Sequence, residues 1–171
     1  MKIYTRTGDK GSTQIYVDKA VRVDKDDLIV QSYGEMDELN SHIGLLCTMV
    51  KAEHKDMLHN VQRKLFQAGF AISASTTLQQ EDIDSLEALI DTLTNKMPPN
   101  TSFVLPGGST AGAQAHVCRA VCRRAERAVI SLAKHHDVPE VVYAYLNRLS
   151  DFLFTFARFV NIEAGVDEVP V

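Results

Sequence analysis

Apolar residues in this chain recur about every 3.6 positions from residue 36 to residue 162, which is the period of amphipathic helices. Two stripes lie in the first half: Met36, Leu39, Ile43, Leu46 and Val50, then Met57, Leu58, Val61, Leu65, Ala68 and Ile72. A weaker helix is expected over 83–93 and two long helices over 111–134 and 141–162, the last with the stripe Leu146, Leu149, Leu153, Phe156 and Val160. With only short extended stretches at 3–5 and 13–17 before them, five helices predict an all-α, up-and-down five-helix bundle.

The length of 171 residues is that of a single domain. Within it we expect an N-terminal segment over 1–31, the bundle over 32–163 and a tail over 164–171. A hydrophobic share of 45% and a net charge of -4 are typical of a globular protein and argue against a nucleic-acid partner. The longest largely apolar run, 43–50, is far shorter than the roughly 18 residues that span a bilayer, and the N-terminus lacks a secretory apolar stretch. A cytoplasmic protein is expected.

The chain has three cysteines, an odd number without the spacing of a disulfide framework or a zinc site. Cys118 and Cys122 are four residues apart in an expected helix, and Cys47 lies near the end of another. We expect all three to be small, reduced core residues.

The stretch TRTGDKGSTQ, residues 5–14, has the glycines, lysine and hydroxyl groups of a phosphate-binding loop. It is not a Walker A loop, because only Asp9 and Lys10 separate Gly8 from Gly11 where that motif requires four residues before Gly-Lys. By itself the stretch favours a tight turn between two short strands. If this stretch binds a nucleotide, other parts of the protein must supply most of the contacts to it.

The connection NKMPPNTSFVLPGGST, between the third and fourth expected helices, holds an apolar trio of Phe103, Val104 and Leu105 between prolines and glycines. Prolines and glycines end both helices and restrict the loop, so Phe103 is held in place. Two interpretations stay open: the trio plugs the open end of the bundle, or it faces a ligand.

The fourth expected helix concentrates positive charge in a chain of net charge -4, with Arg119, Arg123, Arg124 and Arg127 against the single local carboxylate of Glu126. At about 100° per residue, Arg119 and Arg123 fall beside the core stripe rather than opposite it. Arginines at such a boundary suit carboxylate or phosphate partners, and Glu126 can pair with Arg123 at i,i+3. The alternative is an ordinary salt-bridged surface.

Two other helices carry polar faces. Asn147 shares a face of the last helix with Asp151 and Arg158, and its amide suits a base, a ribose or a neighbouring helix. Asp37 lies on a small polar face of the first helix, with Asn40, Ser41 and Gly44, where it can meet an arginine from another element.

Six motifs in order, TRTGDKGST, KDD, YGEMDELNS, FVLPGG, HVCRAVCRRAER and YLNRLSDFLF, resemble the PduO-type ATP:cob(I)alamin adenosyltransferases. The resemblance runs from residue 2 to about residue 160 and implies a trimer of five-helix bundles with active sites between subunits. It implies transfer of the 5'-deoxyadenosyl group of ATP to cob(I)alamin, by attack of Co(I) on C5', with loss of triphosphate. The cofactors implied are ATP and cobalamin, both as substrates, with Mg²⁺ on the phosphates and no dedicated protein metal site.

The resemblance also implies roles for residues. ATP would be held by Thr5, Arg6, Thr7, Gly8, Ser12, Thr13 and Lys25 of one subunit and by Arg123, Arg124, Glu126, Arg127 and Asn147 of the next. Arg123, Asn147 and Phe103 would be the catalytic residues, with Phe103 at the lower face of the corrin, where it displaces the axial base, and Phe154 also binding cobalamin. Asp37 and Arg119 would pair between subunits. A cob(II)alamin reductase and an adenosylcobalamin-dependent enzyme are the implied protein partners.

One segment departs from the family pattern. The run QIYVDKAVRVDKDDLI, from residue 14, lacks the family's usual prolines and has Asp18 where a glycine or a positive charge is more usual. The motif around Lys25 therefore supports an ATP-binding role less strongly than the motif of the fourth helix does. A di-metal bundle of the ferritin-like kind would need Glu-x-x-His, which does not occur in this sequence. A bundle that binds a nucleotide or corrinoid without catalysis, as a sensor or carrier, is the remaining alternative.

Overall fold

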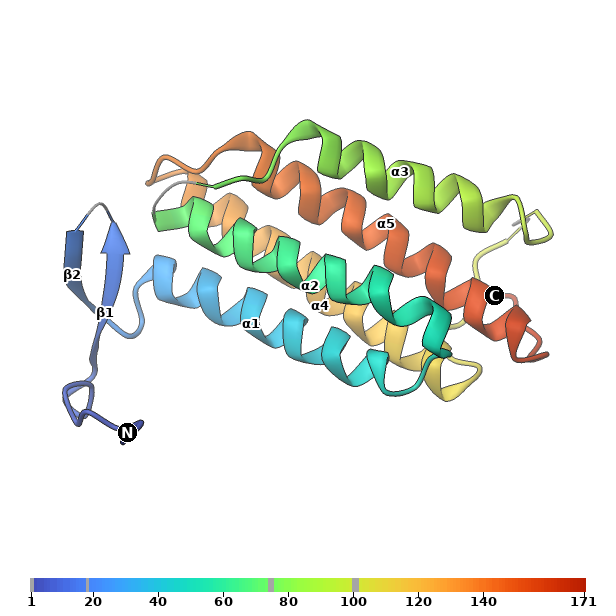
Figure 1. Cartoon of the computed structure of the whole chain (residues 1–171), viewed down its shortest axis with the longest axis horizontal. Coiled ribbons are helices and arrows are strands. Elements are labelled where there is room, and N and C mark those ends of the chain that lie inside the picture. The colour runs from blue at the N-terminus through green and yellow to red at the C-terminus, as the bar shows by residue number, and fades with distance from the viewer. Residues whose placement is uncertain (1, 18, 74–75, 100–101) are drawn as a thin grey trace.

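The computed structural model describes residues 2–17, 19–73, 76–99 and 102–171, which form the five predicted helices and a small hairpin (Figure 1). The helices are α1 (Leu28–Cys47), α2 (Ala52–Ser73), α3 (Gln80–Thr94), α4 (Thr110–Ala133) and α5 (Glu140–Glu163). Each helix runs opposite to the one before it, so the predicted up-and-down bundle is confirmed (Figure 1). The predicted boundary at residue 32 falls inside α1, because Asp27 caps this helix by accepting the Ile29 N–H at 2.9 Å.

The order of packing in the bundle brings α4 to its centre. Helix α1 packs against α2 and α4, α4 packs against α5, and α5 packs against α3. The predicted stripes form the core: every member of the α5 stripe is buried, as are Met36, Leu39, Ile43 and Leu46 of α1. Transfer of such side chains from water stabilises the fold by about 1.5–3 kcal/mol each. None of the described helices is long and apolar enough to cross a membrane.

The N-terminal segment contains more strand than the sequence predicted. Strands β1 (Ser12–Val17) and β2 (Lys19–Asp24) form an antiparallel hairpin, with Ser12 opposite Asp24, whereas residues 3–5 are not a strand. The β2 strand alternates Val21 and Val23 with charged residues, a period of two that the surrounding helical pattern obscured. The run without prolines therefore supplies the end of β1, the whole of β2 and the start of α1, while Asp18 lies outside the described residues.

The three cysteines are free and buried, as predicted. Burial raises the pKa of the Cys118 thiol to about 12 and raises that of Cys47 as well. Since the thiolate is the reactive form, these are packing residues.

Candidate functional site

A cleft of about 410 Å³ opens between α4, α5 and the loop that precedes α4. Its lining combines aromatic rings, cations and hydroxyl groups: Phe103, Val104, Pro106, His116, Arg119, Arg123, Ser150, Asp151, Phe154 and Thr155. Three residues singled out from the sequence for the corrinoid or for catalysis, Phe103, Phe154 and Arg123, thus line one space. An apolar wall beside positive charge suits a large planar ligand next to an anion.

The loop residue Phe103 does not plug the bundle. Its side chain is 85% exposed and that of Leu105 is 54% exposed, so the interpretation of the trio as an end plug is wrong. The backbone is nevertheless held, because Leu105 N–H donates to Val169 O at 2.8 Å and Val171 N–H donates to Phe103 O at 2.9 Å. A large aromatic ring on a fixed backbone is left facing the cleft.

Two polar side chains at the cleft have buried atoms without a hydrogen-bond partner in the described chain. They are both ring nitrogens of His116, which is only 4% exposed, and Nε of Arg119. Burial lowers the pKa of His116, and the neighbouring Arg119 lowers it further, while Glu168 opposes them. The imidazole is therefore neutral near pH 7. Unpaired buried polar atoms are costly, so this wall of the cleft suits a further partner.

Arg124 and Arg127 lie on a different side of α4 from the cleft. They line a cavity of about 250 Å³ with the N-terminal half of α1, including Glu35. Arg124 Nε donates to Glu35 Oε2 at 2.5 Å, and its Nη2 contacts Glu38. The expectation that Glu126 is the only acid near the arginines is wrong, because α1 supplies two more.

The predicted pairing of Glu126 with Arg123 is also absent from the described residues. Glu126 Oε1 instead accepts from Asn147 Nδ2 at 3.1 Å, which joins α4 to α5. Arg123 is exposed at the cleft, and no carboxylate of the described residues pairs with it, although Asp151 lines the same cleft. An unpaired arginine beside a ligand-sized space is suited to an incoming anion.

The other two members of the predicted polar face of α5 are occupied. Asp151 accepts from Arg148 Nη1 at 2.6 Å. Arg158 is buried and donates to both carboxylate oxygens of Glu168 at 3.0 and 2.9 Å. Arg158 is therefore a structural anchor for the C-terminal tail.

The N-terminal loop is organised by the hairpin that follows it. Arg22 Nη2 donates to Thr7 O at 2.6 Å and to Ser12 Oγ at 2.5 Å. The side chain of Lys25 also reaches the loop, since a Cβ placed on Gly8 would lie 3.5 Å from its Nζ. Arg6 takes the left-handed conformation, with φ 60°. The predicted ATP-binding residues of the N-terminal segment thus lie together, in the loop, at the start of β1 and just after β2.

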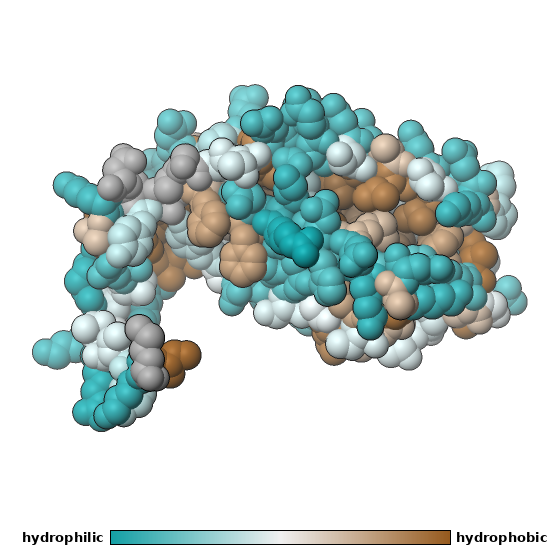
Figure 2. Space-filling view, viewed as in Figure 1, coloured by the Kyte–Doolittle hydropathy of each residue, from teal (hydrophilic) through white to brown (hydrophobic). Residues whose placement is uncertain are grey.

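The N-terminal loop and the cleft loop lie at opposite ends of the bundle (Figure 1). The hairpin stands beyond the end of the bundle where α1 begins, whereas the Phe103 loop enters the end where α1 finishes and α4 starts (Figure 1). Figure 2 shows the end of the N-terminal segment projecting from the bundle with open space between them, although Ile15 and Val23 of the hairpin pack against the core. One chain therefore keeps the N-terminal loop apart from the Phe103 loop, whereas Arg124 and Arg127 lie beside Leu28, at the hairpin's end of the bundle.

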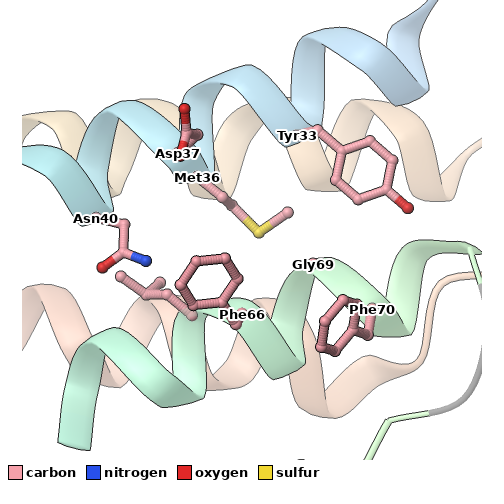
Figure 3. A pocket seen from close by; sticks show the side chains of 8 residues that line it. Tyr33, Met36, Asp37, Asn40, Phe66, Gly69 and Phe70 are labelled. Carbon is pink, nitrogen blue, oxygen red and sulfur yellow. The ribbon is translucent and has the colours of Figure 1, made fainter. Parts of the chain in front are cut away.

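Asp37 lies at the edge of an apolar groove between α1 and α2. The groove holds about 260 Å³ and is lined by Tyr33, Met36, Asp37, Asn40, Leu65, Phe66, Gly69 and Phe70 (Figure 3). Phe66 and Phe70 are 59% and 51% exposed, which is unusual for neighbouring aromatic residues on a helix surface. No ion pair joins Asp37 to Arg119 in the part of the chain that the structure describes.

One group of described residues has the arrangement of a metal site: Glu53, His54 and Glu163, whose ligand atoms lie within 4.8 Å of one another. Lys51 Nζ lies 3.0 Å from Glu163 Oε1, so a cation already neutralises this carboxylate. Burial raises the pKa of Glu163, but hydrogen bonds from Lys51 and His54 outweigh it and lower the pKa overall. The group acts as a salt bridge between α2 and α5.

Sequence reasoning missed two residues at these sites, Arg22 and His116. The alternation of Val21, Arg22 and Val23 was the available signal for Arg22, because it puts the arginine on the face opposite the valines. His116 gave no clear signal, since a histidine near a core stripe is usually a satisfied core residue.

The chain matches the model of the cobalamin adenosyltransferase family over residues 3–160. It is 41% identical to the corrinoid adenosyltransferase of Bacillus subtilis (strain 168), over 99% of this chain and 91% of that protein. The corrinoid adenosyltransferase MMAB of Homo sapiens is 38% identical, over 98% of this chain and 72% of that protein. A solved variant of the PduO-type ATP:corrinoid adenosyltransferase from Lactobacillus reuteri, complexed with cobalamin and ATP, has a TM-score of 0.93 at 32% identity and covers 99% of this chain and 96% of that one.

Proposed function

The chain belongs to the cobalamin adenosyltransferase family, and from this premise we propose that it transfers the 5'-deoxyadenosyl group of ATP to cob(I)alamin. The enzyme is an alkyl transferase: a Co–C5' bond forms, the C5'–O bond breaks, and triphosphate leaves with the electron pair. The observation that carries the proposal is the cleft in which Phe103 and Phe154 lie beside Arg119 and Arg123.

The protein's own part in this reaction is alignment and charge neutralisation, because Co(I) is itself the nucleophile. Arg123 has no carboxylate partner among the described residues and would neutralise the leaving triphosphate. Asn147, already held by Glu126, would orient the ribose or base. Arg124 would meet phosphates only where Glu35 and Glu38 release it or share it. Arg127 lines the same cavity and would add a second positive charge there.

Phe103 would act on the cobalt rather than on ATP. An exposed ring on a fixed backbone can occupy the lower face of the corrin and displace the axial base there. Loss of the lower ligand makes Co(II) easier to reduce to the nucleophilic Co(I). Phe154, on the α5 wall of the same cleft, would extend the apolar contact.

We further propose that a complete site needs two subunits of a homotrimer. The buried Nε of Arg119 has no hydrogen-bond partner in the part of the chain that the structure describes, and Asp37 is an exposed acid beside half-exposed aromatic rings. If these two residues pair between copies, the α1 of one copy lies along the α4 of the next. The start of α1 lies nine helical residues, or about 14 Å, from Asp37, and the hairpin just before it in the first copy would then reach toward Arg123 and Arg127.

Mg²⁺ would be carried by the phosphates of ATP. The described residues at the N-terminal loop offer hydroxyl groups, an arginine and a lysine rather than a carboxylate cage. This fits the usual binding of Mg²⁺, which keeps several waters and substrate oxygens as ligands.

The test is an anaerobic assay with chemically reduced cobalamin, ATP and Mg²⁺, in which loss of cob(I)alamin absorbance and release of triphosphate are followed together. We expect stoichiometric triphosphate, a light-sensitive product, and a loss of about 100-fold in kcat for Arg123→Ala. Binding of ATP and cobalamin without any turnover would instead support a non-catalytic sensor or carrier.

Assembly is tested separately by sedimentation. Arg119→Ala and Asp37→Ala are each expected to lower both the oligomer fraction and the activity, because each leaves a charge without its partner. The charge exchange Asp37→Arg with Arg119→Asp should restore part of both. A single variant that stays trimeric and fully active contradicts the pairing.

A further inference from the structure

The Phe103 loop, residues 103–109, is bonded to the bundle through one buried side chain, that of Asn161 of α5. This residue is 2% exposed. Its Oδ1 accepts Ser109 N–H at 2.8 Å and Ser109 Oγ–H at 2.9 Å, and its Nδ2 donates to Gly107 O at 2.9 Å. One side-chain amide thus accepts from a backbone N–H group and donates to a backbone carbonyl at the base of the loop.

Two glycines leave the room that Asn161 occupies. A Cβ on Gly108 would lie 2.4 Å from Nδ2, and a Cβ on Gly112 would lie 1.9 Å from Oδ1, distances that real Cβ atoms do not adopt. Gly108 also has φ +99°, a conformation open to glycine. The PGGSTAG sequence, residues 106–112, and Asn161 are therefore matched in shape as well as in hydrogen bonding.

Asn161 is also joined to the segment that holds the tip of the loop. Its backbone carbonyl accepts Val166 N–H at 2.9 Å, where the C-terminal tail turns back. The tail then bonds to Phe103 and Leu105. The side chain of Asn161 holds the base of the loop, and its main chain starts the segment that holds the tip.

We propose that Asn161 is a positioning residue for Phe103, acting through the backbone of residues 103–109. Phe103 is too exposed for its own packing to fix it, so its position over the cleft depends on these backbone contacts. The proposal rests on the function proposed above for Phe103. Asn161 itself is not among the residues that line the cleft.

The test uses the near-isosteric variant Asn161→Asp in the full-length protein. Aspartate keeps the acceptor for Ser109 but places an oxygen against Gly107 O, so one hydrogen bond becomes a repulsion. Leu86→Ala on α3 is the control, because it removes a buried side chain and lowers stability without touching the loop.

The first measurement is amide hydrogen exchange at Leu105, whose N–H is bonded to the tail. We expect faster exchange in Asn161→Asp than in Leu86→Ala at matched overall stability. This measurement needs neither substrate, so it decides whether the anchor exists even if the wild-type protein transfers no adenosyl group. Unchanged exchange overturns the proposal.

The second measurement is the absorption and electron paramagnetic resonance spectrum of cob(II)alamin bound with ATP, which reports whether the lower axial base is displaced. In Asn161→Asp we expect a smaller displaced fraction and a loss in kcat of about 10- to 100-fold, with KM for ATP within about twofold of wild type. In a Phe103→Ala background the same change should add no further loss. Wild-type spectra in Asn161→Asp, or additive losses in the double variant, would overturn the positioning role.

Discussion

The Phe103 loop and the N-terminal hairpin are both predicted to carry ligands, but they are held in opposite ways. The Phe103 loop is bonded to α5 and to the C-terminal tail, both of its own chain. The N-terminal loop is bonded to its own hairpin through Arg22 and stands clear of the bundle (Figures 1 and 2).

The difference shows which half of the site a single chain can complete. A loop anchored on the bundle presents a ready surface for a ligand, at a fixed distance from Arg123 and Phe154. A loop that is ordered internally but projects from the bundle needs a surface from another molecule to become part of a site. The three predictions below test this contrast, from the largest expected effect to the smallest.

Gly112→Ala should break the anchored region. Its Cβ would lie 1.9 Å from Asn161 Oδ1, so either α4 or the amide must move, and we expect a loss of about 3 kcal/mol in the free energy of unfolding. Urea unfolding measures the loss. Gly34→Ala in α1 is the control: no atom lies within 4 Å of its Cβ, and alanine should stabilise the helix by about 0.5–1 kcal/mol. Equal effects of the two changes would show that the close approach is unimportant.

Arg22→Ala should disrupt the hairpin region while the bundle stays folded. The Thr7 carbonyl and the Ser12 hydroxyl lose their common donor. We expect KM for ATP to rise about tenfold, equivalent to about 1.4 kcal/mol, and the free energy of unfolding to change by less than about 0.5 kcal/mol. Arg22→Lys keeps the charge but cannot reproduce both contacts, so its KM for ATP should lie between those of wild type and Arg22→Ala. A large loss of bundle stability would mean that the hairpin is not independent.

The anchored region should also respond to pH through His116. Burial lowers its pKa and Arg119 lowers it further, against the opposing charge of Glu168. Below about pH 6.5 the unfolded chain therefore binds more protons at this residue, and stability should fall as pH decreases through the folded pKa. The slope from one such group is at most about 1.4 kcal/mol per pH unit. Urea unfolding of wild type and His116→Leu between pH 7.5 and 5.5 measures this slope. If the free energy of unfolding falls equally with pH in both proteins, His116 is not the group responsible.

The helices could be predicted because their signal is local and long. The stripe from Leu146 to Val160 repeats within one segment, and every member of it is buried. The placement of Arg119 and Arg123 beside the core followed from the same rotation and is confirmed by the cleft they line. The resemblance supplied Phe154, which lies in this cleft, although its role in binding cobalamin stays a prediction.

The missed features depend on contacts distant in sequence. Arg124 pairs with Glu35, 89 residues earlier, and a rotation drawn for one helix cannot show a neighbour's acids. Asn161 reads as an ordinary polar residue of α5, and its importance appears only where the loop from Gly107 returns to it. The β2 strand was missed because six residues with exposed charges give a weak pattern.

The buried cysteines have a practical consequence for chemical labelling. Cys47, Cys118 and Cys122 are enclosed in the core, and burial raises the pKa of all three thiols. Maleimide reagents require an accessible thiolate, so the native thiols should react slowly in the folded protein. A cysteine introduced on the hairpin or the Phe103 loop would then be the preferred target for a fluorophore, with the three native cysteines left in place.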